Sequence, residues 1–141
     1  MTTIRGGAAV PPRLLVTDEV IGLRPLSVQD TAAQMAGEDE ELVGTVGIQS
    51  GMPYLRDGQV NITYGIYPAS RGRGLATRSV LLAMRLAASR APVQEFVIRV
   101  DPDNEASAGV ARHAGFAYLR HTDDSEGILD WYVLLVPSDD P

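Results

Sequence analysis

Alternation of apolar and polar residues is clearest over residues 60–67, and it predicts a strand that buries one face. Val60, Ile62 and Ile66 point to the buried side, and Pro68 ends the strand because it has no N–H to give to a sheet. Related patterns predict further strands at residues 20–26, 43–49, 95–101 and 127–136, and one that opens at Phe116.

Two clear helices are predicted between these strands. The longer covers residues 74–90, where nearly every position outside one polar stripe is apolar. The second covers residues 105–114, with Asp103 or Asn104 as its N-cap and Gly115 as a left-handed C-cap. Both helices are apolar enough to pack against a sheet.

A short helix is also predicted over residues 31–42, TAAQMAGEDEEL, with Ser27 or Asp30 as its cap. The resulting order of strands and helices is typical of an α/β domain with a mixed sheet. A chain of 141 residues makes one such domain over residues 1–141, and we expect flexible tails at 1–12 and 137–141.

Composition narrows the classes of function. The net charge of −6 argues against nucleic acid as a partner, because phosphate contacts need a basic face. All 12 basic residues are Arg, so no Lys can form a Schiff base, and the absence of Cys excludes thiolate catalysis and disulfides. Two His residues offer few ligands for a metal site. The longest apolar run, residues 131–136, is too short to cross a bilayer, and the N-terminus lacks a hydrophobic signal region. We therefore expect a cytoplasmic protein with no metal, no membrane partner and no nucleic-acid partner.

The stretch RGRG, residues 71–74, lies between the 60–67 strand and the longer helix. The first N–H groups of a helix have no internal partners, and the helix dipole adds positive potential there. Gly72 and Gly74 allow an anion to approach the backbone, while Arg71 and Arg73 offer charge-assisted hydrogen bonds. The turn is neither a Walker loop nor a GxGxxG motif. It is either a phosphate site or an ordinary basic turn.

Two segments together resemble the GNAT-type N-acetyltransferases, in particular the branch with the ribosomal-protein N-terminal acetyltransferases. The first is YPASRGRGLATRSVLLAMRLA, whose residues Arg71 to Ala76 fit the pyrophosphate loop (Q/R)xxGx(G/A) of that family. The second is VIRVDPDNEASAGVARHAGF, which supplies Asn104 and Ser107 before a helix that ends in Gly-Phe. The resemblance covers about residues 58–122 strongly.

The resemblance implies a GNAT-like α/β fold, a mixed and mostly antiparallel sheet flanked by helices, with acetyl-CoA as acyl donor and no metal. It implies that the pyrophosphate lies on the loop amides and that pantetheine pairs with the end of the preceding strand. Asn104 is expected to bond to pantetheine or nearby backbone, and Ser107 to protonate or stabilise the leaving thiolate. The implied cofactor-binding residues are Ile66, Tyr67, Arg71, Gly72, Arg73, Gly74, Leu75, Ala76, Thr77, Asn104 and Ser107, and the implied catalytic residue is Ser107.

Simpler structural roles compete with several of these assignments. Asn104 is also explained as a helix cap, and Ser107 as a small residue that allows close packing. Many relatives have a Tyr acid one turn later, where this chain has Ala111, and a Glu base where it has Asn61, an amide that cannot take a proton. Tyr64 and Tyr67 are interpreted as packing residues, with Tyr67 a lesser candidate for the acceptor pocket; Trp131 and Tyr132 either belong to the core or border the acyl group.

The segment from Leu26 to Gly58 is several tens of residues shorter than in relatives, which place two helices and a strand there. In relatives that segment forms one wall of the acceptor site. With this wall reduced, the sequence does not distinguish two kinds of primary-amine acceptor, a protein N-terminus and a small-molecule amine. It also predicts a possible homo-oligomer whose partner covers the gap. The alternatives to an N-acetyltransferase are an acyl-CoA-binding module with little turnover and a nucleotide-phosphate binder.

Overall fold

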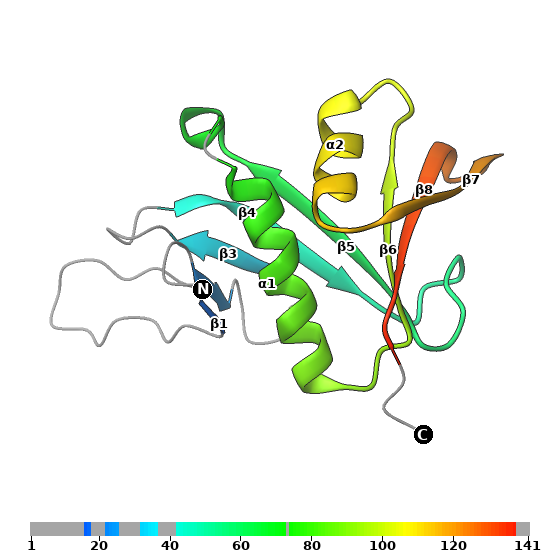
Figure 1. The fold of residues 1–141 in the computed structure, drawn as a ribbon, viewed down its shortest axis with the longest axis horizontal. Coiled ribbons are helices and arrows are strands. Elements are labelled where there is room, and N and C mark those ends of the chain that lie inside the picture. The colour runs from blue at the N-terminus through cyan, green and yellow to red at the C-terminus, as the bar shows by residue number, and fades with distance from the viewer. Residues whose placement is uncertain (1–15, 18–21, 26–31, 37–41, 73, 138–141) are drawn as a thin grey trace, which may run out of the picture.

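The computed structural model describes residues 16–17, 22–25, 32–36, 42–72 and 74–137, which form one mixed sheet with helices (Figure 1). The strands are β1 Val16–Thr17, β2 Gly22–Pro25, β3 Ala32–Ala36, β4 Leu42–Gln49, β5 Gln59–Ile66, β6 Glu95–Val100, β7 Ala117–Asp124 and β8 Gly127–Leu135. The helices are the 3-10 helix η1 Pro68–Ser70 and the α-helices α1 Leu75–Arg90 and α2 Glu105–His113.

The sheet has the strand order β1-β2-β3-β4-β5-β6-β8-β7. Neighbouring strands run antiparallel at every described pair except β5 and β6, which are parallel and are connected through α1. This crossover brings the start of α1 to the end of β5, where the glycine-rich turn lies (Figure 1). The mixed sheet predicted from the order of elements is confirmed, as is its mostly antiparallel character, which the family resemblance implied.

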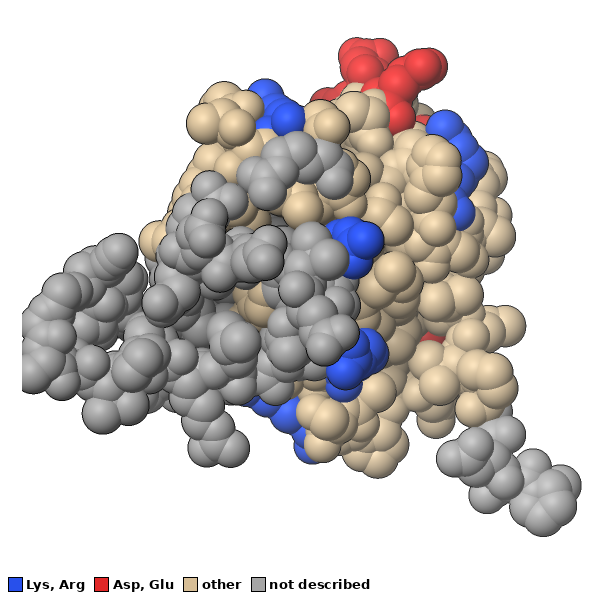
Figure 2. All heavy atoms as spheres, turned by 60° about the vertical axis from the view of Figure 1, so that its left-hand side comes forward, with Lys and Arg blue, Asp and Glu red and all other residues tan. Residues whose placement is uncertain are grey.

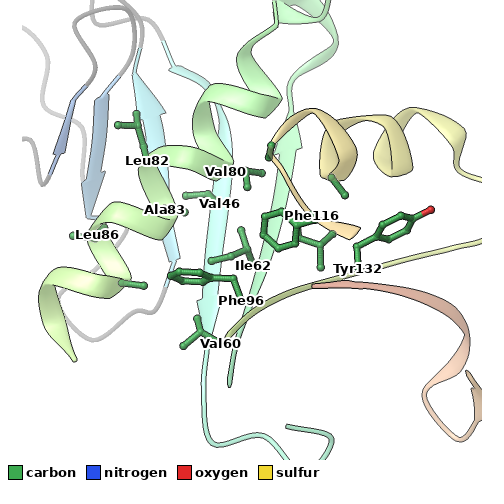
Figure 3. Packing of buried hydrophobic residues seen from close by; sticks show 14 of the residues in the cluster. Val46, Val60, Ile62, Val80, Leu82, Ala83, Leu86, Phe96, Phe116 and Tyr132 are labelled. Atoms are coloured by element: carbon green, nitrogen blue, oxygen red, sulfur yellow. The ribbon is translucent and has the colours of Figure 1, made fainter. Parts of the chain in front are cut away.

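The core joins one face of the sheet to α1. Val46 of β4, Ile62 of β5 and Phe96 of β6 lie in one buried cluster with Val80 and Ala83 of α1 (Figure 3). Each of these side chains is at most 4% exposed. Residues 60, 62, 64 and 66 of β5 all belong to this cluster or pack on its rim, so the alternation in the sequence identified the correct face.

Residues 32–36 correct one prediction from the sequence. We predicted a helix over residues 31–42, but Ala32–Ala36 is the strand β3, paired antiparallel with β2 on one side and β4 on the other. A helix this short gains little from Ala and Gln propensity, because nucleation is costly, whereas two neighbouring strands satisfy its backbone groups. The predicted caps Ser27 and Asp30 lie outside the described residues, as do the predicted tail 1–12 and, apart from Pro137, the predicted tail 137–141.

The strands β2, β4, β5, β6, β7 and β8 and the helices α1 and α2 agree with the sequence to within a few residues, whereas β1 and η1 were not predicted. Asn104 is the N-cap of α2, and its Oδ1 accepts a hydrogen bond from the N–H of Ser107 at 3.0 Å. Gly115 follows α2 with a φ of 100°, the left-handed conformation expected for a glycine at this end. Within the described residues, no helix has the length and apolar character to cross a membrane.

Candidate functional site

The two parallel strands separate at one end, and the candidate site lies there. β5 and β6 pair only from Gln59–Glu95 to Asn61–Val97, although both strands continue beyond that point. The N–H of Tyr67 donates to the carbonyl of Val43 in β4 at 2.8 Å. Because successive residues of a strand direct their backbone groups to opposite edges, the groups of residues 64 and 66 point toward the gap. The gap therefore has an open strand edge, as the predicted pairing with pantetheine requires.

The turn between β5 and α1 gives this gap an anion-binding rim. Gly72 and Gly74 have φ of 82° and 72°, which an L-residue rarely adopts, and a Cβ added at either would meet nothing within 4 Å. Gly74 is the N-cap of α1 and makes no side-chain cap, so the N–H groups of residues 75–77 precede the first intrahelical bond and face outward. Nε of Arg71 donates to the carbonyl of Ile66 at 3.2 Å, which ties the turn to the strand end. The backbone here fits a pyrophosphate group.

A cavity of about 550 Å³ joins the gap, the turn and α2. It brings together most of the predicted cofactor-binding residues, namely Ile66, Arg71, Gly72, Gly74, Leu75, Ala76, Thr77, Asn104 and Ser107. Tyr67 does not line this cavity; it is the N-cap residue of η1, and it is 41% exposed. Arg73 lies outside the described residues. The assignment of individual contacts to acetyl-CoA remains a prediction.

Tyr64 lines the cavity but is absent from the predicted site, because its alternation placed it with packing residues; Gly65, Ser70, Ala106 and Val110 also line the cavity and were not predicted. Its ring is half-buried on β5, and its hydroxyl donates to the backbone carbonyl of Ser107 at 3.0 Å. Burial raises the pKa of the Tyr64 phenol above its ordinary value, and the side chain of Ser107 acts in the opposite direction. The bond spans the gap from β5 to α2. The sequence signal that could have identified Tyr64 as a cavity residue is its place in the segment directly before a glycine-rich turn.

The opposite face of β5 carries polar residues near the same gap. Asn61 is 3% exposed; its Nδ2 donates to Oε1 of Gln49 at 2.9 Å, while its Oδ1 is buried without a hydrogen-bond partner. Thr63, two residues on, is exposed on that face. Trp131 and Tyr132, left open by the sequence, are both buried, at 3% and 6%. His113 is exposed, and its Nδ1 bonds to the carbonyl of Gly109.

Charge around the cavity is mixed. Arg71 lies in its lining, and the exposed residues Asp101, Asp103 and Glu105 lie at the start of α2. Figure 2 shows acidic side chains gathered at the top of the molecule, while the basic side chains visible on this face are separated from one another. Among the described residues, no group of three or more His, Asp or Glu side chains is arranged to hold a metal ion.

Comparison with known proteins was made at the levels of family and structure. A family model described as an acetyltransferase (GNAT) domain matches residues 21–117. Of the solved structures, RimL, a ribosomal L7/L12 alpha-N-protein acetyltransferase in complex with coenzyme A, superposes with a TM-score of 0.64 at 22% identity, covering 74% of this chain and 61% of RimL. No curated protein sequence matches the chain.

Two further structures have comparable scores. An acetyl transferase from Salmonella typhimurium that modifies the N-terminal serine of ribosomal protein L7/L12 has a TM-score of 0.64 at 22% identity, covering 75% of this chain and 63% of its own. A mutant of the spermidine N-acetyltransferase SpeG from Vibrio cholerae has a TM-score of 0.64 at 13% identity, covering 77% and 66%. The chain thus spans about three fifths of the length of the two L7/L12 acetyltransferases. At these identities, the likeness shows the fold.

Proposed function

The chain belongs to the GNAT acetyltransferase domain family, and on this premise we propose that it transfers an acetyl group from acetyl-CoA to a primary amine. The observation that carries the proposal is the gap between β5 and β6, whose open strand edge continues directly into the glycine turn and the start of α1. A long ligand with an anionic end and an amide-containing arm suits this arrangement, because the helix N-terminus binds anions and the strand edge binds amides.

In the proposal, different residues of the cavity bind different parts of acetyl-CoA. The amides from Gly72 to Thr77 hold the pyrophosphate, with Arg71 and Arg73 adding charge. The backbone of Ile66 and the residues beside it hold the pantetheine arm, and a strand-end N–H stabilises the oxyanion that forms when the amine attacks the thioester carbon. Ser107 stabilises the departing sulfur. Direct attack needs no covalent enzyme intermediate and no metal.

The amine approaches from the face of the sheet that α1 and α2 do not cover. Asn61 lies on that face beside the last β5–β6 pair, and its amide cannot accept the proton that the amine must lose. In the proposal, either a water molecule takes this proton or the amine arrives already neutral. The acceptor is a protein N-terminus, as for the L7/L12 acetyltransferases, or a small amine, as for the spermidine acetyltransferase.

Asn61 also favours one alternative, an acyl-CoA-binding module with little turnover. Calorimetric titration with acetyl-CoA, CoA and ATP separates the ligand classes, and release of free thiol over a panel of amines measures transfer. The panel includes a peptide that begins with Ser, spermidine and single amino acids. The proposal predicts binding of both CoA forms in preference to ATP, and thiol release with at least one amine. Binding without release with any amine would favour the module, and preference for ATP would contradict both.

A further inference from the structure

Two buried polar atoms on the face of the sheet away from α1 and α2 lack a hydrogen bond. Oδ1 of Asn61 on β5 and Nε of Arg99 on β6 have no hydrogen-bond partner among the described residues. The Asn61 amide is oriented by its other end, because Nδ2 donates to Oε1 of Gln49 at 2.9 Å. One of the two atoms is an acceptor and the other a donor. Folded proteins satisfy nearly all such atoms, so this pair indicates a group that the chain alone does not supply.

The strand register places both side chains at the opening of the gap. Asn61 pairs with Val97, and this is the last β5–β6 pair before the strands separate. Arg99 lies two residues further along β6, about 7 Å on, and therefore on the same face as Val97. Its neighbours Ile98 and Val100 belong to the core cluster beneath the helices. Asn61 and Arg99 thus lie on the face from which the amine approaches in the proposed reaction.

The guanidinium group of Arg99 packs against two aromatic rings. Its Cζ lies 3.5 Å from the ring centroid of Tyr54 and 5.3 Å from that of Trp131, and the two rings meet edge to face. Trp131 is 3% exposed, and the side chain of Arg99 is 13% exposed. A ring stacked on the face of a guanidinium leaves the N–H groups, which lie in its plane, available for hydrogen bonds. The rings therefore fix the cation without using its donors.

One carboxylate already lies near Arg99, but at the distance of a loose ion pair. Nη2 of Arg99 is 3.6 Å from Oε1 of Glu126, whereas a charge-assisted hydrogen bond measures about 2.7–2.9 Å. The side chain of Glu126 is 50% exposed, so solvent competes for its charge. A guanidinium binds a carboxylate best through two parallel N–H groups. Arg99 retains the capacity to bind a second carboxylate in this way.

We propose that Arg99 and Asn61 together recognise the acceptor, and that this acceptor is an amino acid with a free carboxylate. Arg99 binds the carboxylate, and Oδ1 of Asn61 accepts a hydrogen bond from the amine, which directs the nitrogen toward the thioester in the gap. Asn61 positions the amine and takes no proton from it. The inference rests on the proposed function and narrows its acceptor. A polyamine would bring positive charge against Arg99, and the first residue of a peptide has its carboxylate converted to an amide.

Calorimetric titration of the wild-type protein saturated with CoA tests the acceptor class without turnover. The titrants are the common L-amino acids, the amide of each, a peptide that begins with Ser, and spermidine. Each amide keeps the amine and removes only the charged carboxylate. At least one amino acid is expected to bind about tenfold or more tightly than its amide, and to change the fluorescence of Trp131, the only Trp of the chain. Thiol release from acetyl-CoA should show the same preference in kcat/KM.

Two variants assign the two ends of the acceptor. Arg99→Met should abolish the preference for an amino acid over its amide. Asn61→Leu should weaken the amino acid and the amide alike and leave their ratio unchanged, because both carry the amine. Arg120→Met is the matched control, since Arg120 also lies over the Trp131 ring, at 4.4 Å, but on β7, which β8 separates from β6. It should alter neither affinity. Each variant is checked for its melting temperature and for CoA affinity.

Equal binding of every amino acid and its amide, or binding of none, would overturn the inference. A lower melting temperature in Arg99→Met with the preference intact would also overturn it, since Arg99 would then only support the packing of Tyr54 and Trp131. If Arg99→Met fails to fold, Arg99→Lys replaces it, and its point charge without bidentate geometry should reduce the preference; an unchanged preference contradicts the role. Transfer to spermidine or the peptide alone would leave the proposed function intact and overturn only this inference. Failure of the wild-type protein to bind CoA would refute the proposed function, and the inference with it.

Discussion

The two ends of β5 differ: its first residues pair with β6, whereas its last residues are separated from β6. At the paired end, the buried Gln59 donates through Nε2 to Oε1 of Glu95 at 2.7 Å, and Arg56 lies 3.5 Å from the same oxygen. The carbonyl of Gly58 accepts from the N–H groups of both Gln94 and Glu95. At the separated end, β6 offers no register partner to residues 62–66.

The difference shows how one pair of strands can be both a structural joint and a binding site. Polar groups at the paired end satisfy one another, which avoids the cost of burying them alone. At the separated end β6 gives the backbone groups of β5 no strand partner, although the Ile66 carbonyl accepts from Nε of Arg71. The hydrophobic cluster with α1 holds the strand in place there. Substitutions at the two ends should therefore affect different properties.

The largest expected effect is on ligand binding at the separated end. Gly74→Val should weaken acetyl-CoA binding by about tenfold or more, because a β-branched residue is strained at a φ of 72° and its side chain enters the space of the anion. Arg71→Ala and Arg73→Ala should each cost less, since single exposed guanidinium contacts are modest. Calorimetric titration measures all three. Equal losses from the glycine and arginine changes would argue against binding through the loop amides.

A substitution at the paired end should change stability and leave ligand binding alone. Gln59→Leu removes the donor to the buried Glu95 carboxylate, and we expect the free energy of unfolding to fall by about 1–3 kcal/mol. Gln94→Leu is the matched control, because the Gln94 side chain at the same end is exposed. Denaturant unfolding and acetyl-CoA titration follow both variants. A large change in acetyl-CoA affinity in Gln59→Leu would show that the two ends are coupled.

Ser107→Ala sharpens the comparison within the separated end. If the hydroxyl acts on the leaving sulfur, kcat should fall severalfold while acetyl-CoA affinity stays nearly constant, the pattern of an interaction made mainly in the transition state. The helix cap is unaffected, because Asn104 bonds to the backbone N–H of Ser107. Lower affinity or melting temperature with kcat per folded molecule intact would assign Ser107 to packing.

The smallest expected effect concerns association between copies of the chain. The short segment between Leu26 and Gly58 predicts incomplete cover of the acceptor side, and therefore a homo-oligomer with slower or less selective transfer than longer relatives. Light scattering over a range of concentrations, combined with a steady-state assay, measures both. A stable monomer with rapid and selective transfer would contradict this prediction.

Much of the fold could be predicted because its signals are local. The alternation in β5 and the Asn104 cap each depend on residues a few positions apart, and the structure bears both out. The strand β3 could not be predicted in this way, since Ala32–Ala36 is set by pairing with β2 and β4. The contact of Tyr64 with Ser107 joins residues 43 positions apart, and periodicity alone assigned Tyr64 to packing.

Hydrogen exchange with and without acetyl-CoA tests the central claim most directly, because it reads both ends of β5 in one experiment. The account predicts that acetyl-CoA slows exchange of the amides at residue 66 and at residues 72–77, and leaves the amides of Gln59 to Asn61 unchanged. Protection confined to the paired end, or no protection at the turn under conditions where acetyl-CoA is bound, would contradict it.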